Sequence, residues 1–255
     1  MTGKIEVADG LSIVRGIPLD EEQGIGPLTL GGYVREVARR YGPREAAVIH
    51  LGGSVVRWSY DDLLARSMEV ARALVARGVG KGTRVGILMT NRPEFLAALF
   101  GTALAGGVAT TISTFFTPNE IDEVLKASGI SVLLLERTVL KKDFVEVLTT
   151  LEPLIGTAAH GAVGSLRYPF LRHLAAIDIA EPVGAVETWT GFAAAGTVID
   201  PALVEACADA VAPSDPGVLF FSSGSTGKAK GILSAHRGVC LQLWRWAARC
   251  PRADR

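Results

Sequence analysis

RWSYDDLLARSMEVARALVARGVGKGTRVGILMTNRPEFLAALFGTALAGGVATTI, residues 57–112, is the stretch of sequence that decides the fold. Residues 60–77 place their apolar side chains at the spacing of an amphipathic helix. Residues 85–89 form a short apolar run, which is typical of a strand buried on both faces of a parallel sheet. A helix beginning near Pro93 and a second apolar run at 108–112 repeat this pattern. The stretch therefore predicts a helix followed by a strand–helix–strand unit.

The sequence on either side continues the alternation. We expect a helix at 30–41, a hairpin of strands 46–51 and 54–60, a helix opened by Thr117, Pro118 and Glu120 as a capping box, a strand at 131–135 and a helix at 138–151. Strands and helices that alternate at this spacing indicate right-handed βαβ units. We predict an α/β fold with a mostly parallel sheet and helices on both faces. Residues 153–170, rich in Gly, Ala and Pro, are predicted to be a surface connection.

Composition excludes several classes of protein. The 255 residues include 26 basic and 26 acidic side chains, and 49% are hydrophobic, which is too apolar for a disordered chain. Because the net charge is zero and no basic stripe is present, nucleic acid is not expected as a partner. The stretch 95–119 has no charged residue, but a glycine pair and a β-branched run divide it, so we predict a buried helix and strand and no transmembrane segment.

Neither the cysteines nor the histidines form a recognisable site. Cys207, Cys240 and Cys250 have no C-x-x-C spacing, which favours a reducing compartment, and we predict a cytoplasmic protein. The four histidines are scattered, without carboxylates or cysteines at the spacing of metal ligands. No protein metal site is therefore predicted.

The segment FFSSGSTGKAKG, residues 220–231, is the candidate for a ligand-binding site. Strand-like residues on both sides enclose hydroxyls, glycines and two lysines, which together can cradle a phosphate group. The same composition is found in flexible connectors, and that alternative stays open. A Walker P-loop is excluded because Ser222 stands at the first glycine position, Ala229 follows the lysine, and strand-like residues come next in place of a helix.

This segment resembles the signature loop of the AMP-forming adenylating enzymes, the AMP-dependent synthetases and ligases. The apolar lead-in, the Ser/Thr/Gly core and the closing Lys-Gly all match, while Ala229 stands where the family usually has proline. Residues 57–112 are also similar to the early part of that family, and the similarity extends with gaps from about Leu30 to Trp246. The fold implied is a partial N-terminal domain of the acetyl-CoA synthetase-like type.

The resemblance implies an acyl-CoA synthetase, a ligase that uses ATP, Mg²⁺ and CoA to activate a small-molecule carboxylic acid such as a fatty acid. The residues implied to bind the nucleotide phosphates are Ser222, Ser223, Gly224, Ser225, Thr226, Gly227, Lys228 and Lys230. His236 and Trp244 are candidates for a substrate pocket, although one of Trp244 and Trp246 is expected to pack in the core. No catalytic residue is assigned, and the sequence does not specify the acid.

Three segments are expected along the chain: an N-terminal extension at 1–29, a partial AMP-binding (adenylation) domain at 30–246, and a C-terminal tail at 247–255. The family's adenine, ribose and hinge motifs and its C-terminal domain with the catalytic lysine are not recognisable, so we expect a truncated enzyme that is inactive by itself. An incomplete domain leaves a sheet flank without partners, which predicts self-association or a homodimer. The alternatives are an inactive remnant that binds nucleotide or pairs with another chain, and an unrelated α/β protein whose Gly/Ser loop is a connector.

Overall fold

The computed structural model describes residues 5–8, 11–14, 18–51, 53–223 and 229–249. Its centre is a seven-stranded sheet in the order β11-β10-β7-β5-β6-β12-β13, in which only the β12–β13 pair is antiparallel. The strands are β5 (Arg84–Leu88), β6 (Val108–Thr111), β7 (Val132–Glu136), β10 (His173–Ile177), β11 (Val186–Thr188), β12 (Pro216–Ser223) and β13 (Ala229–Ala235). The predicted α/β class and mostly parallel sheet are confirmed, whereas β10 and β11 were not predicted.

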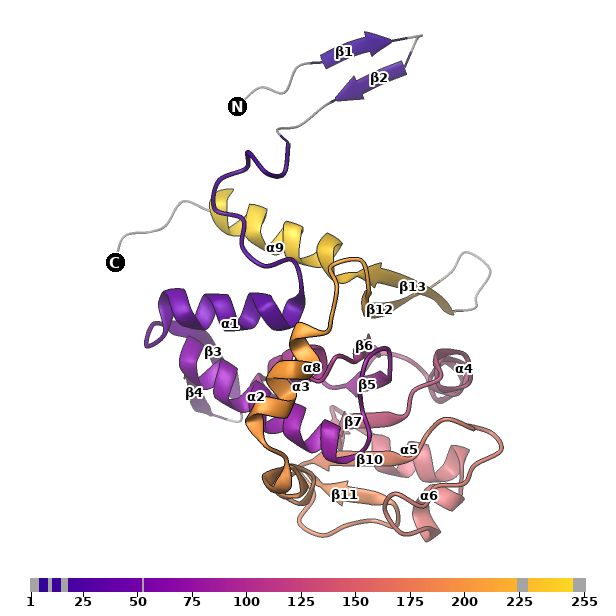
Figure 1. Ribbon diagram of the computed structural model, residues 1–255. Coiled ribbons are helices and arrows are strands. Elements are labelled where there is room, and N and C mark those ends of the chain that lie inside the picture. The colour runs from indigo at the N-terminus through magenta and orange to yellow at the C-terminus, as the bar shows by residue number, and fades with distance from the viewer. Residues whose placement is uncertain (1–4, 9–10, 15–17, 52, 224–228, 250–255) are drawn as a thin grey trace.

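Helices cover both faces of the sheet (Figure 1). One face carries α1 (Leu30–Tyr41), α2 (Tyr60–Ala76), α3 (Pro93–Leu104), α7 (Trp189–Ala194), the 3-10 helix η1 (Ala195–Val198) and α8 (Pro201–Asp209), and the other carries α4 (Pro118–Ser128), α5 (Phe144–Leu151) and α6 (Leu154–Thr157). Each face of the sheet packs on one hydrophobic cluster, the first under α1, α2 and α3 and the second under α4, α5 and α6. Successive strand residues point to opposite faces, so Leu134 belongs to the first cluster, and Leu133 and Leu135 belong to the second.

The predicted β-hairpin and the predicted capping box of α4 are both confirmed. β3 (Glu45–Leu51) and β4 (Ser54–Ser59) form the predicted antiparallel hairpin, and β1 (Ile5–Ala8) pairs with β2 (Leu11–Val14) in another. At α4, the Glu120 amide donates to Thr117 Oγ1 at 3.3 Å and the Thr117 amide donates to Glu120 Oε2 at 2.7 Å. This reciprocal capping fixes where α4 begins.

The helix predicted at 138–151 is wrong in its first part. Residues 138–143 form a short hairpin of β8 (Thr138–Val139) and β9 (Lys142–Asp143), and Leu140 between them has a left-handed φ of 56°. Helix α5 begins only after Asp143, whose Oδ1 accepts from the amides of Val145 and Glu146 at 2.9 and 3.1 Å. Capping by Asp143 therefore ends the turn and starts the helix.

The surface connection predicted at 153–170 is also corrected. This segment contains α6, and it buries Ile155, Val163 and Tyr168 in the second hydrophobic cluster. The Tyr168 hydroxyl donates to Asp122 Oδ1 on α4 at 2.8 Å. A segment without apolar periodicity thus packs onto the core because single side chains reach partners that are distant in sequence.

The uncharged stretch 95–119 divides into α3, β6 and the start of α4, as expected. Within the described residues, no single helix is long and apolar enough to cross a membrane. The pair Trp189–Val198 and Pro201–Asp209 meets the criterion of length and composition only when taken together, and it is bent by 91°.

Candidate functional site

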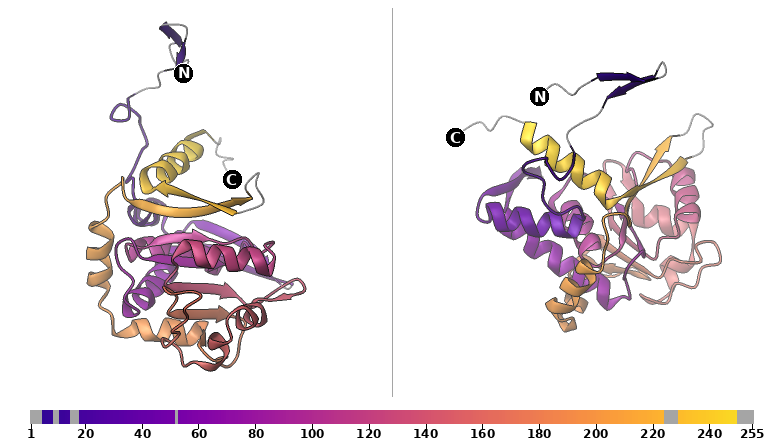
Figure 2. Two further views of the ribbon diagram at one scale, coloured as in Figure 1. Left: turned by 90° about the vertical axis from the view of Figure 1, so that its right-hand side faces the viewer. Right: turned by 45° about the horizontal axis from the view of Figure 1, so that its top comes forward.

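The predicted phosphate loop begins at the carboxyl end of β12. Val218 and Leu219 on this strand pair in parallel with Ala109 and Thr110 of β6, so the loop emerges beside the carboxyl end of β6. Figures 1 and 2 show β12, β13 and α9 (His236–Arg249) at the end of the sheet opposite β10 and β11. β12 therefore ends, and β13 begins, on the side of the sheet where open parallel sheets commonly bind ligands.

The structure places three of the eight predicted phosphate-binding residues: Ser222 and Ser223 on β12 and Lys230 on β13. Ser222 lies opposite Lys230 in the ladder, and both are exposed. Gly224, Ser225, Thr226, Gly227 and Lys228 lie outside the described residues. A hydroxyl and an ammonium group thus stand side by side at the base of the loop.

A hollow of about 860 Å³ opens at the same carboxyl edge. Its walls come from three segments that are distant in sequence: Met89, Thr90 and Asn91 after β5, Ile112, Ser113, Thr114 and Phe115 after β6, and Val139, Leu140, Lys141 and Lys142 of the β8–β9 hairpin. Its volume is typical of a site for a small molecule, and its lining is mainly apolar. Phe115 and Leu140 are 81% and 88% exposed.

Polar contacts fix the shape of this hollow. Lys142 Nζ donates to the carbonyl oxygens of Thr114, Phe115 and Phe116 at 3.1, 3.1 and 2.9 Å. These bonds hold the β8–β9 hairpin against the segment that follows β6. Lys141, in contrast, is exposed, and no ion pair joins it to another described residue. Its ammonium group is therefore available to an anionic ligand.

Arg92 joins the carboxyl ends of three strands. Its guanidinium contacts Glu94, Glu136 and Asp178 at 2.8, 3.2 and 2.8 Å. Burial opposes the charge on Arg92, but hydrogen bonds to Glu94 and Asp178 outweigh that effect and raise its pKa. Glu136 also accepts from the amide and hydroxyl of Thr90 at 2.9 and 2.7 Å, which anchors one wall of the hollow.

His236 and Trp244 lie away from the hollow and pack against α1 and the segment before it. The Leu30 amide donates to His236 Nδ1 at 3.2 Å, and the buried Nε2 atom has no hydrogen-bond partner among the described residues. Burial lowers the pKa of His236. Trp244 donates to the Pro27 carbonyl at 3.0 Å and is 5% exposed, whereas Trp246 is 66% exposed. One tryptophan in the core is confirmed, and the pocket role of His236 and Trp244 stays a prediction.

The residues around the hollow were not predicted from the sequence. A usable signal was present, because Thr90-Asn91 and Ser113-Thr114 directly follow two predicted parallel strands, whose carboxyl ends must lie at one edge.

Among the described residues, no group of three or more His, Cys, Asp or Glu side chains could hold a metal ion. Mg²⁺ commonly binds through substrate phosphates and one or two carboxylates, so its use does not require such a group.

Comparison with known proteins gives a consistent result. A family model described as "AMP-binding enzyme" matches residues 34–255. A putative acyl-CoA synthetase, YngI of Bacillus subtilis, is 29% identical over 83% of this chain and 38% of its own length. 4-Coumarate–CoA ligase 2 of Oryza sativa subsp. japonica is 34% identical over 67% of this chain and 28% of its own length.

Solved structures share the fold. The anthranilate CoA ligase AuaEII, in complex with anthranoyl-AMP, has a TM-score of 0.68 at 20% identity, covering 88% of this chain and 38% of that one. The N-terminal domain of FACL13 from Mycobacterium tuberculosis has a TM-score of 0.64 at 21% identity, covering 88% and 48% respectively. The chain thus spans 28–38% of the length of the two curated relatives above and matches the N-terminal part of such enzymes.

Proposed function

The chain belongs to the AMP-binding enzyme family, and from that premise we propose that it carries the phosphate-binding part of an AMP-forming acyl-CoA synthetase. In the proposed reaction, a carboxylic acid attacks ATP to give an acyl-adenylate and pyrophosphate, and the thiol of CoA then displaces AMP. The relatives named as CoA ligases and acyl-CoA synthetases support this reaction class. The identity of the acid stays open.

The observation that supports the proposal is the pairing of Ser222 on β12 with Lys230 on β13, both exposed, at the two ends of the segment that resembles the signature loop. We assign its amides and hydroxyls to the β- and γ-phosphates. Lys228, outside the described residues, and Lys230 would balance the charge that grows on the leaving pyrophosphate. Mg²⁺ would enter with the triphosphate and supply further positive charge there.

The hollow at the carboxyl ends of β5 and β6 suits a different part of the substrates. Its apolar walls favour the hydrocarbon portion of the acid or of CoA over a triphosphate. Lys141 at its rim can meet a carboxylate or phosphate group. The triphosphate and the hydrocarbon portion of the acid or of CoA would then bind on the same side of the sheet.

Protection of the loop tests the assignment. We expect ATP with Mg²⁺, or pyrophosphate with Mg²⁺, to slow hydrogen exchange across residues 218–235. Lys230→Ala should remove most of that protection, whereas Lys126→Ala, which removes an ammonium group from the α4 surface, should leave it unchanged. Unchanged exchange at millimolar ligand would support the connector alternative.

We also propose that a polypeptide of these 255 residues forms no acyl-CoA by itself. Holding the acid, the adenosine and the triphosphate in line contributes about 7–11 kcal/mol to such a reaction. The contacts proposed above serve the triphosphate and a hydrocarbon group, and none is assigned to the adenosine. A coupled assay with ATP, CoA and short, long and aromatic acids should show no thioester, and adding the remaining part of a full-length relative should restore some turnover. Thioester formed by the polypeptide alone would overturn this proposal.

The compartment is a further proposal. Cys207 and Cys240 are free thiols, and burial raises the pKa of Cys240 to about 12. A buried thiol of this kind behaves as a small apolar side chain, which agrees with the reducing, cytoplasmic location proposed from the sequence.

A further inference from the structure

A second, smaller pocket lies at the start of α3 and shares no lining residue with the hollow. It has a volume of about 250 Å³ and is enclosed by the β3–β4 hairpin, α2, α3 and α7. Its lining residues are Val56, Trp58, Arg66, Glu69, Val70, Pro93, Glu94, Ala97, Trp189 and Ala193. The volume falls below the usual range for whole drug-sized ligands, so it suits a head group.

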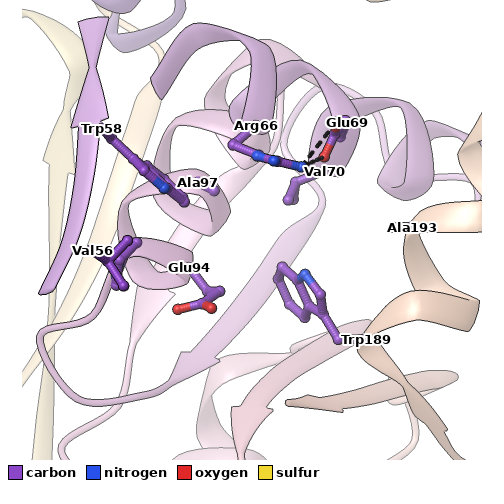
Figure 3. Close-up of a pocket in the computed structure, with 10 residues that line it drawn as sticks. Val56, Trp58, Arg66, Glu69, Val70, Glu94, Ala97, Trp189 and Ala193 are labelled. Carbon is purple, nitrogen blue, oxygen red and sulfur yellow. Dashed lines mark hydrogen bonds and ion pairs between the residues drawn. The ribbon is translucent and has the colours of Figure 1, made fainter. Parts of the chain in front are cut away.

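Two indole rings form facing walls of this pocket. Trp58 comes from β4 and Trp189 from the first residue of α7, and Figure 3 shows them on opposite sides with the Glu94 side chain between them. Both tryptophans are half-buried, and none of the described arginines lies over either ring. Phe192 packs against Trp189 with ring centroids 5.4 Å apart, so the parts of the two indoles that line the pocket are the ones that can receive a cation.

The charges around the pocket favour the same ligand. Arg66 is held by Glu69 at 3.1 Å, which balances one carboxylate at the rim. Arg92 contacts both carboxylate oxygens of Glu94, at 2.8 and 3.4 Å, and also pairs with Glu136 and Asp178. One positive charge against three carboxylates leaves this group with a net negative charge beside the pocket.

We propose that this pocket binds a small organic cation, an alkylated or quaternary ammonium group on a short chain. The indole faces attract the positive charge, Val70 and Ala97 contact its methyl groups, and Glu94 supplies a nearby negative charge. An anion of the same size is disfavoured by the excess of carboxylates around Arg92. No residue of β12 or β13 lines this pocket, and its proposed ligand is distinct from the acid, ATP and CoA.

The four tryptophans provide an internal control for the test. Choline is titrated into the full 255-residue chain while the indole N–H signals are followed by NMR, each assigned by substitution. We expect the signals of Trp58 and Trp189 to shift, and those of Trp244 and Trp246 to stay in place. The neutral isostere 3,3-dimethylbutan-1-ol should bind about tenfold more weakly, since it keeps the shape and loses the charge.

Variants separate the contributions. Trp58→Leu and Trp189→Leu should each weaken choline binding about tenfold, and Glu94→Gln should weaken it severalfold, because each removes one attraction for the cation. Trp246→Leu, on an exposed site outside the pocket, should leave the affinity unchanged. If a tryptophan variant fails to fold, Glu94→Gln and the neutral isostere still decide the question. Equal binding of choline and its isostere, or no shift of the Trp58 and Trp189 signals, would overturn the proposal.

Discussion

The centre of the seven-stranded sheet and its β12–β13 edge are built from the same kinds of apolar residue, but they expose them differently. On β7, Leu133, Leu134 and Leu135 are each 0% exposed. At the edge, Phe220, Ile232 and Leu233 are 41%, 51% and 51% exposed. Central strands have a neighbour on each side and helices on both faces, whereas β13 pairs with β12 alone.

The two regions therefore differ in what they contribute: the buried strands contribute to stability, and the exposed edge carries the proposed binding residues. Buried charged groups away from β12 and β13 are paired, as with Arg77 after α2 and Glu187 on β11, which are 7% and 9% exposed. The edge instead holds exposed Ser222 and Lys230 beside the loop. A ligand needs reachable hydroxyls and ammonium groups, so the proposed site occupies the part of the sheet that contributes least to the hydrophobic core. The following substitutions test this division, from the largest expected effect to the smallest.

The largest effect is expected where the buried ion pair is broken. Arg77→Met leaves Glu187 buried without its partner and should lower the free energy of unfolding by about 3–5 kcal/mol, measured by urea denaturation. Arg66→Met, which breaks an exposed pair with Glu69, should cost less than about 1 kcal/mol. The double variant Arg77→Met/Glu187→Leu should recover much of the loss. Equal effects at Arg77 and Arg66 would contradict the division.

A matched pair of leucines compares the two regions directly. Leu134→Ala opens a cavity in the fully buried centre and should cost about 2–5 kcal/mol. Leu233→Ala, on the half-exposed edge strand, should cost less than about 1 kcal/mol. Both values follow from urea unfolding under the same conditions. A cost at Leu233 as large as that at Leu134 would show that the edge is covered in solution.

Acid should weaken the contact between α4 and the 153–170 segment. Hydrogen bonds from Arg167, Lys126 and Tyr168 hold the pKa of Asp122 well below its usual range. Because the folded-state pKa is the lower one, this stabilisation is complete above the unfolded pKa of about 3.9 and is lost as the pH falls below it.

Asp122→Asn tests this dependence. The variant should be less stable at neutral pH by about 1–3 kcal/mol, through lost charged hydrogen bonds. Its free energy of unfolding should also fall less steeply than the unsubstituted protein's between about pH 5 and pH 2. Asp61→Asn, at an exposed position, is the control and should leave the slope nearly unchanged. Parallel slopes for Asp122→Asn and the unsubstituted protein would contradict the expectation.

The smallest effect on stability is expected at the edge itself. Ile232→Lys should change the free energy of unfolding by less than about 0.5 kcal/mol and should reduce self-association, because a lysine blocks strand-to-strand pairing. Sedimentation velocity over a range of concentrations measures this. Val198→Lys, on η1, replaces another exposed apolar residue and should leave association unchanged. A chain that sediments as a monomer at all concentrations would remove the predicted homodimer.

Features that depend on neighbouring residues could be predicted from the sequence. The Thr117–Glu120 capping box involves groups three residues apart, and the hydrogen bonds that satisfy it are local. Apolar runs such as 132–135 indicate buried strands because such runs cannot be solvated favourably. The Asp143 cap was missed because the helical periodicity of 144–151 was extended back across a turn.

The sequence by itself determined the alternation of strands and helices, the family, and the loop between β12 and β13, because each depends on local spacing or on a contiguous motif. Tertiary structure decided which distant segments meet. The order of strands places β5 between β7 and β6, and this brings residues 89–91, 112–115 and 139–142 around one hollow. It also brings Trp58 to Trp189 across a second pocket. The segments that meet lie up to 53 residues apart at the hollow (142 − 89) and 131 apart at the pocket (189 − 58), so their convergence depends on how the elements pack and not on a local pattern.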